Sequence, residues 1–512
     1  MDPINTPPAE AGHARIRRVV IAGGGTAGWM VAACMSKVLG KALDIRLIES
    51  DEIGTVGVGE ATIPTLLTFH QLLELNEQEF MAATNATFKL GIRFEGWRDL
   101  GQDYIHSFGL TGKDHWTAGF QHFWLKGRQR QLAGDYGDYC LELKAAEQSR
   151  FAHLPHGGMN YAFHLDASLY AQFLRRFSEG FGVQRLEGKI VGVNLAPDTG
   201  HIQSLRLDSG DLIEGDLFID CTGFRALLIG EALKVPYEDW SHWLHCDSAL
   251  AVQTATVSEP VPYTRSVAHG AGWQWRIPLQ NRVGNGLVYA RGHLGDDEAR
   301  TLLLSRIHGE PLTAPRVIRF TPGQRVQTWR GNCVAIGLSS GFIEPLESTS
   351  IHLIQRGIVR LMQTFPSAGI SAADVAEYNR QARDEIEHIR DFIVLHYHVT
   401  NRSDTPFWRH CQAMDIPASL RHRIDLFRQT GRVFRVANEL FAENSWIQVM
   451  LGQGITPARY HPVADLMGDA ELAGFLGGIK AKVDKTVAQL PSHQEYVQRY
   501  CGKPAAPHRP VP

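Results

Sequence analysis

The glycine-rich segment at residues 18–28, RVVIAGGGTAG, constrains what this chain can fold into more than any other stretch of its sequence. Residues 19–21 are β-branched, as is typical of a buried parallel strand, and Gly23, Gly25 and Gly28 then give GxGxxG where a helix is expected to begin. The first glycine permits the turn, the second lets the backbone approach a pyrophosphate, and the third packs the helix on the strand. Because a helix N-terminus attracts phosphate charge, this segment predicts a dinucleotide site.

The residues that follow complete the dinucleotide pattern. A helix is expected over residues 29–39, Gly40 ends it, and residues 43–48 form a second apolar strand that leads into Glu49. This acid lies about 20 residues beyond the glycines, where it can accept hydrogen bonds from ribose hydroxyls. Its charge also disfavours a 2′-phosphate, so FAD or NAD is predicted rather than NADP. The fold class is therefore α/β, with a Rossmann-like dinucleotide-binding domain.

Composition excludes several other classes of protein. The net charge of −3 predicts no attraction to nucleic acid or to an anionic membrane. The apolar runs are too short to span a bilayer, and residues 1–14 lack the basic and apolar regions of a signal peptide, so a cytoplasmic protein is expected. The seven cysteines are odd in number and include no CxxC pair, so neither a disulfide framework nor a metal site is expected.

Changes of pattern divide the 512 residues into four parts. These are a disordered N-terminus at 1–14, a cofactor-binding core at 15–365, a helical substrate-side region at 366–500 and a disordered tail at 501–512. Within the core, residues 98–160 are rich in aromatics, histidine and glycine and are expected to form a pocket wall or lid. His388, His396 and His398 lack the i, i+4 spacing and the acids of a metal site, so structural roles are expected for them.

Four further segments of the core have sequence patterns that predict their local structure or a contact with a ligand. Residues 54–64, GTVGVGEATIP, are a glycine-rich strap whose small residues let the backbone lie against a flat or charged ligand. A helical stretch is expected over 66–83, and residues 87–97 alternate apolar and polar residues like a half-buried strand, on which the pattern alone would leave Lys89 in solvent. Residues 215–224, GDLFIDCTGF, read as a strand that in flavoproteins with two dinucleotide domains runs beneath FAD.

This last segment favours FAD over NAD. Together with the helical pattern of the C-terminal region, it leads us to expect a Rossmann-like FAD-binding domain of the flavin monooxygenase type with a helical C-terminal cap. No second GxGxxG is present, so we expect no NAD(P)H domain. The reducing equivalents would then arrive as flavin that has been reduced elsewhere.

Residues 272–278, GWQWRIP, place Trp273 and Trp275 two positions apart. On a strand, both indoles would face the same side. On the pattern alone, generic core packing explains this spacing as well as a binding role does.

Residues 344–365 begin EPLESTS and continue with apolar residues at helical spacing, after a buried strand and small-residue turn at 332–342. The free amides at 348–350 would form an anion site that suits a halide, a phosphate or a carboxylate. Glu347, taken alone, is a first-turn acid that satisfies the helix dipole.

The chain closely resembles the flavin-dependent tryptophan halogenase family over nearly all of residues 18–500. The motifs that carry the resemblance, in this order, are GGGTAGW, GVGEATIP, TFKLGIRF, GWQWRIP and GFIEPLESTS. The most specific is WxWxIP, which that family has and the related aromatic monooxygenases lack. The resemblance implies that reduced FAD reacts with O2 to a hydroperoxide, which a bound chloride or bromide attacks to give hypohalous acid. It also implies a separate flavin reductase as the source of FADH2.

The resemblance assigns roles to individual residues. Lys89 matches the catalytic lysine, Glu347 and Ser348 match the catalytic pair, and Thr349 and Ser350 fall where backbone amides hold the halide. An ammonium group suits the activation of hypohalous acid, and a carboxylate suits the stabilisation and deprotonation of a cationic ring. Trp273, Trp275 and Pro278 would wall the flavin from the substrate. The expected cofactor residues are Gly23, Gly25, Thr26, Ala27, Gly28, Glu49, Gly57, Gly59, Glu60, Ala61, Thr222, Gly223, Gly337 and Ile351.

Substrate recognition departs from the family pattern. His106 and Phe108 resemble the pair that sandwiches an indole, and Pro345 and Trp446 are the other expected substrate residues. Members that act on free tryptophan hold its amino-acid group with a Tyr-Tyr pair and a nearby Glu, whereas residues 444–454 offer Ser-Trp and no acid. An ammonium group would lose its partner here, so we hypothesise an indole or another electron-rich arene in a more open pocket.

Several points stay open at this stage. Ser350 stands where many relatives carry glycine, which leaves the choice between chloride and bromide undecided. An aromatic monooxygenase would share the FAD pattern, although WxWxIP and Lys89 argue against it. A non-catalytic flavin-binding protein is disfavoured by the intact Lys89, Glu347 and Ser348. The chain is expected to be a monomer or a homodimer.

Overall fold

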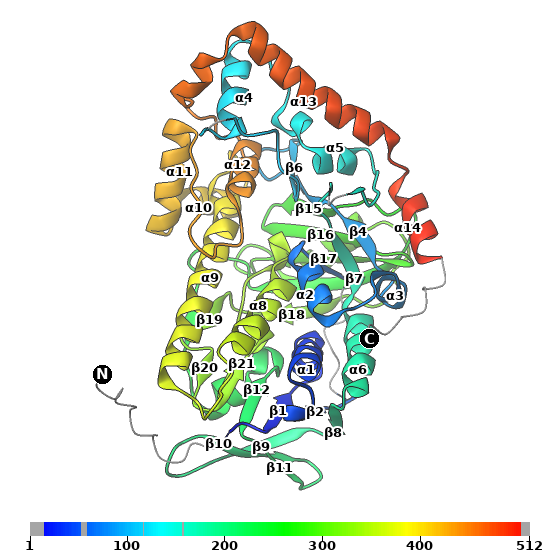
Figure 1. The fold of residues 1–512 in the computed structure, drawn as a ribbon, viewed down its shortest axis with the longest axis vertical. Helices are drawn as coiled ribbons and strands as arrows, with labels where there is room; N and C mark the ends of the chain where they lie inside the picture. The colour runs from blue at the N-terminus through cyan, green and yellow to red at the C-terminus, as the bar shows by residue number, and fades with distance from the viewer. Residues whose placement is uncertain (1–14, 53–58, 116, 156–157, 503–512) are drawn as a thin grey trace, which may run out of the picture.

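The computed structural model describes residues 15–52, 59–115, 117–155 and 158–502. A six-stranded sheet in the lower half of Figure 1 carries the nucleotide motif, and its strand order is β20-β21-β12-β1-β2-β8. Its strands pair in parallel except for the hairpin of β20 and β21. They are β1 (Arg18–Ala22), β2 (Asp44–Glu49), β8 (Gln184–Glu187), β12 (Leu217–Asp220), β20 (Trp329–Arg330) and β21 (Cys333–Ala335).

The predicted dinucleotide unit is confirmed. β1 leads into helix α1 (Thr26–Leu39), Gly40 follows the helix with a φ of 52°, and β2 ends at Glu49. Gly23 has a φ of 106°, a left-handed conformation that favours glycine. A Cβ on Gly28 would lie 1.9 Å from the carbonyl oxygen of Gly23, so the third glycine of the motif allows the helix to pack against the turn.

A seven-stranded sheet forms the second layer, with the order β18-β14-β17-β16-β15-β5-β6. Its pairs are antiparallel except for β15 with β5. The WxWxIP motif lies on its central strand β16. The strands are β5 (Gly91–Glu95), β6 (Asp103–Ser107), β14 (Ser248–Ala255), β15 (Thr264–His269), β16 (Gly272–Pro278), β17 (Arg282–Tyr289) and β18 (Arg316–Arg319).

Three small sheets complete the β-structure of the described residues. The sheet β3-β7-β4 consists of β3 (Gly59–Ala61), β4 (Thr87–Lys89) and β7 (Ala162–Asp166). The others are β11-β10-β9, with β9 (Ile190–Leu195), β10 (Ile202–Leu207) and β11 (Leu212–Glu214), and β13-β19-β22, with β13 (Tyr237–Asp239), β19 (Gly323–Arg325) and β22 (Gly341–Phe342).

Two predicted elements are each divided in the structure. The expected strand at 87–97 is β4 and β5, which belong to different sheets, and Lys89 at the end of β4 is fully buried rather than solvated. The pattern failed here because β4 is covered on both faces. The expected helix at 66–83 is α2 (Thr65–Leu73) and α3 (Glu77–Ala83), separated at Glu74, which adopts a left-handed conformation.

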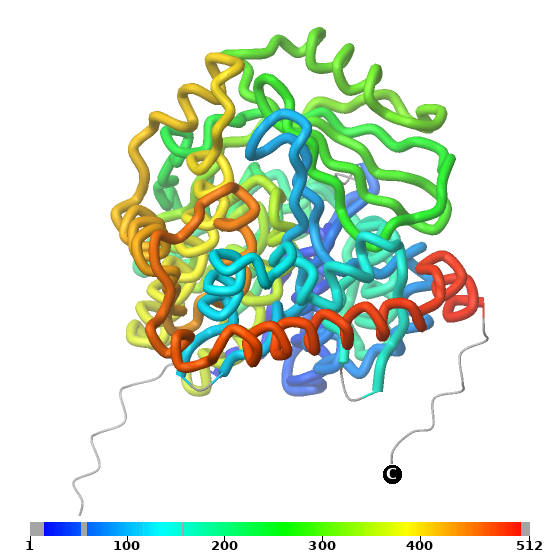
Figure 2. Tube along the Cα trace, turned by 90° about the horizontal axis from the view of Figure 1, so that it is seen from above, coloured from blue at the N-terminus to red at the C-terminus, as the bar shows by residue number. Residues whose placement is uncertain are grey.

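The C-terminal region is helical, as expected, and it caps the sheets. The long helix α9 packs against α8 and α10, while α13 crosses the upper end of the molecule and α14 returns to α3 (Figures 1 and 2). The remaining helices are α4 (Phe120–Gln129), α5 (Leu141–Glu147), α6 (Ala167–Gly180), α7 (Asp296–Arg306), α8 (Ser350–Gln363), α9 (Ala372–His398), α10 (Pro406–Ala413), α11 (Ala418–Thr430), α12 (Glu443–Gly452), α13 (Asp469–Gln489) and α14 (His493–Cys501).

The boundary of the expected C-terminal tail is corrected by α14. Cys501 is the last residue of this helix, whose N-terminus is capped by Ser492, so the helical region extends beyond residue 500. Residues 1–14 and 503–512, for which we expected disorder, lie outside the described residues. No helix in the described part of the chain is long and apolar enough to cross a membrane.

Candidate active site

A cavity of about 740 Å³ lies between the two large hydrophobic cores, where α1 and α8 face β16. This volume is in the range of cofactor and ligand pockets. One end of the cavity is formed by the glycine-rich turn and the other by the tryptophan strand. The expected cofactor residues that line it are Gly23, Gly25, Thr26, Ala27, Glu49, Gly59, Glu60, Ala61, Thr222, Gly223, Gly337 and Ile351. Gly28 does not line the cavity, because it packs against the backbone of Gly23, and Gly57 lies outside the described residues.

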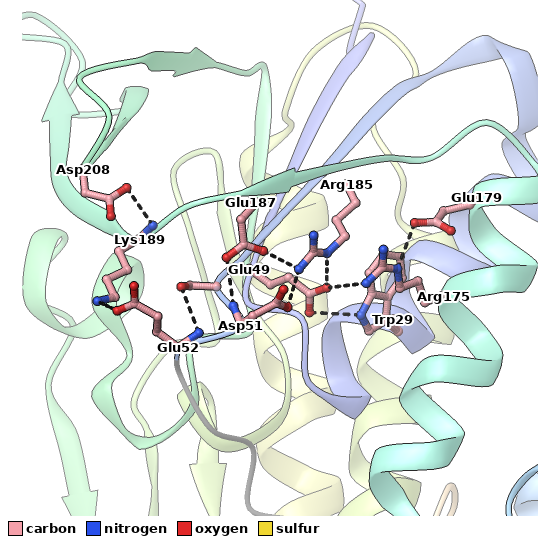
Figure 3. A network of polar contacts seen from close by, with 11 residues as sticks. Trp29, Glu49, Asp51, Glu52, Arg175, Glu179, Arg185, Glu187, Lys189 and Asp208 are labelled. Atoms are coloured by element: carbon pink, nitrogen blue, oxygen red, sulfur yellow. Dashed lines mark hydrogen bonds and ion pairs between the residues drawn. The ribbon is translucent and has the colours of Figure 1, made fainter.

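Glu49 is held at the nucleotide end by a network of charged side chains, shown in Figure 3. Its Oε1 accepts a hydrogen bond from Arg185 Nε at 2.5 Å and lies 3.7 Å from Arg175, and its Oε2 accepts one from Trp29 Nε1 at 3.3 Å. A Cβ on Gly24 would lie 1.6 Å from Oε2 of Glu49, so the carboxylate occupies the space that a side chain at this position would need. Gly24 is therefore required here, although the GxGxxG pattern gives no role to the residue at this position.

The cavity fits an FAD molecule. At one end, the backbone of the glycine-rich turn and the carboxylate of Glu49 offer partners for a pyrophosphate and a ribose. At the other end, Trp273, Trp275 and Ile277 give an apolar surface for a flat ring system. Both polar and aromatic requirements of a dinucleotide are thus met within one cavity.

The aromatic wall is built from alternate residues of β16. Trp273 and Trp275 both line the cavity, as expected, and Ile277 continues their row. Pro278 does not line it, contrary to our expectation, because successive side chains on a strand point to opposite faces. Its carbonyl oxygen accepts a hydrogen bond from Thr87 Oγ at 2.8 Å instead.

A buried carboxyl group anchors the first indole of this wall. Glu344 Oε2 accepts hydrogen bonds from Trp273 Nε1 at 2.7 Å and from the Tyr397 hydroxyl at 2.6 Å. Burial raises the pKa of Glu344 to about 7, against the lowering effect of these two donors. Glu344 thus connects β16 with α9 at a position three residues before Glu347.

Lys89 is fully buried behind Ser348. Its Nζ donates hydrogen bonds to Ser348 Oγ at 2.8 Å and to the carbonyl oxygen of Thr62 at 2.9 Å, and it lies 5.2 Å from the ring centre of Phe108. Burial lowers the pKa of Lys89 to about 7, although the charge of Glu347 acts in the opposite direction. The amine is therefore desolvated, directed by two acceptors and placed against an aromatic face.

Glu347 is buried between two imidazoles. Nδ1 of His106 lies 2.9 Å from Oε2, and Nε2 of His396 lies 2.8 Å from Oε1. Burial alone would raise the pKa of Glu347, but these contacts lower it to about 2. His396, for which we expected a structural role, thus lies in direct contact with the expected catalytic acid.

Ser348 connects the acid to the helix that follows. It has a left-handed backbone conformation, with φ 60° and ψ 37°, which costs energy for a residue with a side chain and is concentrated at functional sites. Thr349 is the N-cap position of α8 and is fully buried, and Ser350 begins the helix and lines the cavity together with Ser348. The start of α8 therefore separates the cavity from Lys89.

The expected substrate residues fall into two groups. Phe108 lies against Lys89 and His106 against Glu347, whereas Pro345 lines the cofactor cavity. Trp446 belongs to an aromatic cluster beside His106, in which its ring centre lies 4.8 Å from that of Phe392.

Helix α12 clamps the segment that carries His106 and Phe108. Gln448 Oε1 accepts a hydrogen bond from the backbone N–H of Ser107 at 2.9 Å, and Asn444 Nδ2 donates to the carbonyl oxygen of Gly109 at 2.6 Å. These two side chains lie one turn apart on one face of the helix. Neither residue was predicted from the sequence, and their i, i+4 spacing was the signal available.

A family model described as tryptophan halogenase matches residues 18–469 of the chain. The chain is 34% identical to the tryptophan 7-halogenase RebH of Lentzea aerocolonigenes, over 96% of this chain and 99% of that protein. Among solved structures it is similar to Xcc4156, a flavin-dependent halogenase from Xanthomonas campestris, with a TM-score of 0.94 and 66% identity over 96% of this chain and 100% of that chain. It is also similar to BrvH, a flavin-dependent halogenase from Brevundimonas sp. BAL3, with a TM-score of 0.92 and 45% identity over 95% and 99% of the two chains.

Proposed function

The chain belongs to the tryptophan halogenase family and is a flavin-dependent halogenase, and we propose that its substrate is an indole or another electron-rich arene without an amino-acid group. The enzymes of this family use FADH2, a halide and O2, and they depend on a separate flavin reductase. The comparisons support this activity rather than the hydroxylase or the non-catalytic alternative.

Bound reduced FAD supplies, with O2, the oxidising power that converts the halide to hypohalous acid. The glycine-rich turn and Glu49 would bind the dinucleotide, and Trp273 and Trp275 would exclude the arene from the cavity. The amides at Thr349 and Ser350 would hold the halide at the start of α8. A small neutral oxidant can then reach Lys89, whereas the larger arene stays on the other side.

Lys89 would direct the halogen onto the arene. Its Nζ is fixed by Ser348 and Thr62 and lies beside Phe108, so a group bound to Nζ is presented to a ring in the substrate site. The amine activates hypohalous acid by donating a hydrogen bond to its oxygen or by taking up the halogen itself. In both cases the hydroxide leaves as water after it has received a proton.

Glu347 would stabilise the cationic ring and then remove its proton. With a pKa of about 2, the group is a carboxylate at neutral pH and is ready to face positive charge. His106 and His396 hold both oxygens and orient the carboxylate. The C–H proton passes to Glu347, and the ring recovers its aromaticity with the halogen in place.

The observation that carries the choice of substrate is the pairing of Glu439. This buried carboxylate lies beside Trp446 and accepts a hydrogen bond from its Nε1 at 2.9 Å. It is also ion-paired with Arg423, whose guanidinium stacks 4.0 Å from the Trp446 ring centre. The acid nearest to the expected substrate residue Trp446 is thus already neutralised, and the ammonium group of tryptophan would find no partner there.

Mass spectrometry of indole and tryptophan tests this proposal. Each arene is incubated with the protein, FAD, a flavin reductase, NADH and either chloride or bromide, and Lys89→Met serves as a control that keeps a side chain of similar length. We expect a halogen isotope pattern on indole, little on tryptophan and none with the variant. Efficient halogenation of tryptophan would overturn the substrate assignment, and halogenation by Lys89→Met would overturn the role of the lysine.

A further inference from the structure

A hydrogen-bonded chain of three side chains lies outside the machinery described above and ends at the cofactor cavity. Thr87 on β4 and His164 on β7 are directly opposite each other, and Thr264 on β15 follows. Thr87 Oγ lies 3.2 Å from His164 Nδ1, and His164 Nε2 lies 2.9 Å from Thr264 Oγ. All three residues are buried, and Thr264 lines the cavity.

The direction of each hydrogen bond in this chain follows from the contact that Thr87 makes at the end farthest from the cavity. Thr87 Oγ donates its only proton to the carbonyl oxygen of Pro278 at 2.8 Å, because a carbonyl can only accept. Thr87 Oγ must then accept from His164, so the proton of the imidazole is on Nδ1. Nε2 of a neutral imidazole is left as an acceptor, and Thr264 donates its proton to it. The oxygen of Thr264 therefore retains only lone pairs.

This assignment requires that His164 is neutral. The imidazole is fully buried, and Lys89 lies near it on the neighbouring strand. Burial lowers the pKa of His164 far below its ordinary value, and the charges of Lys89 and His493 act in the same direction. A neutral imidazole has one N–H donor and one nitrogen acceptor. Because the donor at Nδ1 is directed to Thr87, the acceptor at Nε2 faces Thr264.

Thr264 precedes Arg265, which pairs with Arg276, so the neighbour of Thr264 across β15 and β16 is Ile277. Ile277 also lines the cavity and lies beside Gly59. With the pyrophosphate on the glycine-rich turn, the isoalloxazine ring would lie at the end of the cavity formed by Trp273, Trp275 and Ile277, next to Thr264. Reduced flavin carries a ring N–H where oxidised flavin has only a nitrogen lone pair. A hydroxyl that can only accept would therefore face a donor in the reduced state of this ring and a second acceptor in the oxidised state.

We propose that Thr264 is a specificity residue that favours reduced over oxidised FAD, because Thr87 and His164 hold its hydroxyl as a hydrogen-bond acceptor. The proposal rests on the flavin-dependent activity given above. Such a preference suits an enzyme that takes up reduced flavin from a separate reductase and must release it after oxidation.

The test is the ratio of two dissociation constants, those of FAD and of FADH2, measured anaerobically by fluorescence titration. Thr264→Val removes the hydroxyl with little change in shape, and Thr264→Ser is its control because it keeps the hydroxyl. We expect the wild type to bind FADH2 more tightly than FAD, and Thr264→Val to reduce that preference by roughly 3- to 10-fold, the value of one neutral hydrogen bond. Thr264→Ser should retain it.

A second variant changes the direction of the hydrogen bond between His164 and Thr264 without replacing a residue that lines the cavity. Thr87→Val removes the group that fixes the proton on Nδ1, so the imidazole can carry its proton on Nε2 and donate to Thr264. The hydroxyl of Thr264 can then donate into the cavity, and the preference for FADH2 should fall or reverse. Thr87→Ser keeps the acceptor and should behave as the wild type. A purely structural role of Thr264 would not produce this effect.

The outcomes separate this inference from the proposed function. An unchanged ratio in Thr264→Val, or equal weakening of both flavins, would overturn the role of Thr264 while leaving the halogenase intact. Failure of the wild type to bind either flavin would instead contradict flavin dependence itself. Circular dichroism spectra and thermal unfolding midpoints confirm that each variant is folded before the titrations are compared.

Discussion

At the scale of single residues, the charge of Lys89 is set by two opposing neighbours. Its pKa of about 7 reflects burial, which lowers it, and the charge of Glu347, which raises it. We expect Glu347→Gln to lower the pKa of Lys89 further, because the stabilising negative charge is lost. The measurement is the pH titration of ¹³Cε-labelled lysine by NMR, with the signal assigned by its loss in Lys89→Met. An unchanged pKa would show that Glu347 does not act on the amine.

The same low pKa predicts how stability depends on pH. Between about pH 7 and pH 10, folded Lys89 binds fewer protons than it does in the unfolded chain, so its contribution to the free energy of unfolding rises with pH. Below pH 7, the full cost of the buried charge is present. Lys89→Met removes the group, so the wild type should gain thermal stability relative to this variant as pH rises from 7 to 10. A constant difference in unfolding midpoint would contradict the buried, low-pKa state.

Glu344 has the opposite effect in a lower pH range: its contribution to the free energy of unfolding decreases as pH rises. Its pKa of about 7 lies above the ordinary value for glutamic acid, so the folded protein binds more protons than the unfolded chain between about pH 4.5 and pH 7. Its contribution to stability is complete below this window and decreases as pH rises through it. Glu344→Gln keeps a neutral acceptor for Trp273 and Tyr397, so this variant should gain stability relative to the wild type from pH 5 to pH 7, as measured by thermal unfolding.

At the scale of elements, one face of α12 holds the segment that carries His106 and Phe108 in position. Gln448 is 5% exposed and accepts the backbone N–H of Ser107, so its removal leaves a buried donor unpaired at a cost of about 1–3 kcal/mol. We expect Gln448→Ala to lower the unfolding midpoint and to raise the KM for the arene, while the affinity for FAD is unchanged. The exposed Gln429 on α11 offers a matched control. An equal loss of FAD binding would indicate general unfolding rather than loss of the clamp.

At the scale of the whole molecule, one cavity joins the two hydrophobic cores. A ligand that binds only the folded protein stabilises it by about 2.7 kcal/mol at 100 times its dissociation constant. FAD would reach from Glu49 to the tryptophan wall, whereas FMN lacks the adenosine monophosphate part that the glycine-rich turn and Glu49 would hold. We expect FAD to raise the unfolding midpoint more than FMN does at equal concentration, as measured by differential scanning fluorimetry. Equal shifts would contradict a cofactor that spans the cavity.

The sequence by itself determined the parts of this protein that depend on local geometry. The strand, glycines, helix and acid from Arg18 to Glu49 follow one another within a single βαβ unit, so their spacing fixes their arrangement. The apolar face of α8 and the common face of Trp273 and Trp275 follow from the periods of helices and strands. The start of α8 was less exact, because Glu347, expected in its first turn, lies in a short turn before Ser350. Three of the motifs that indicated the halogenase family, GGGTAGW, GWQWRIP and GFIEPLESTS, belong to these local units.

Only the tertiary structure decided which side chains are buried and which meet across long separations in the chain. Lys89 appears as a solvated strand residue by its pattern, but β4 is covered on both faces and the amine is buried. His396 reaches Glu347 from a helix that begins after residue 370, and Thr264 meets His164 across two sheets. Desolvation and hydrogen-bond polarity, which set the chemistry of these groups, depend on neighbours that no local spacing specifies.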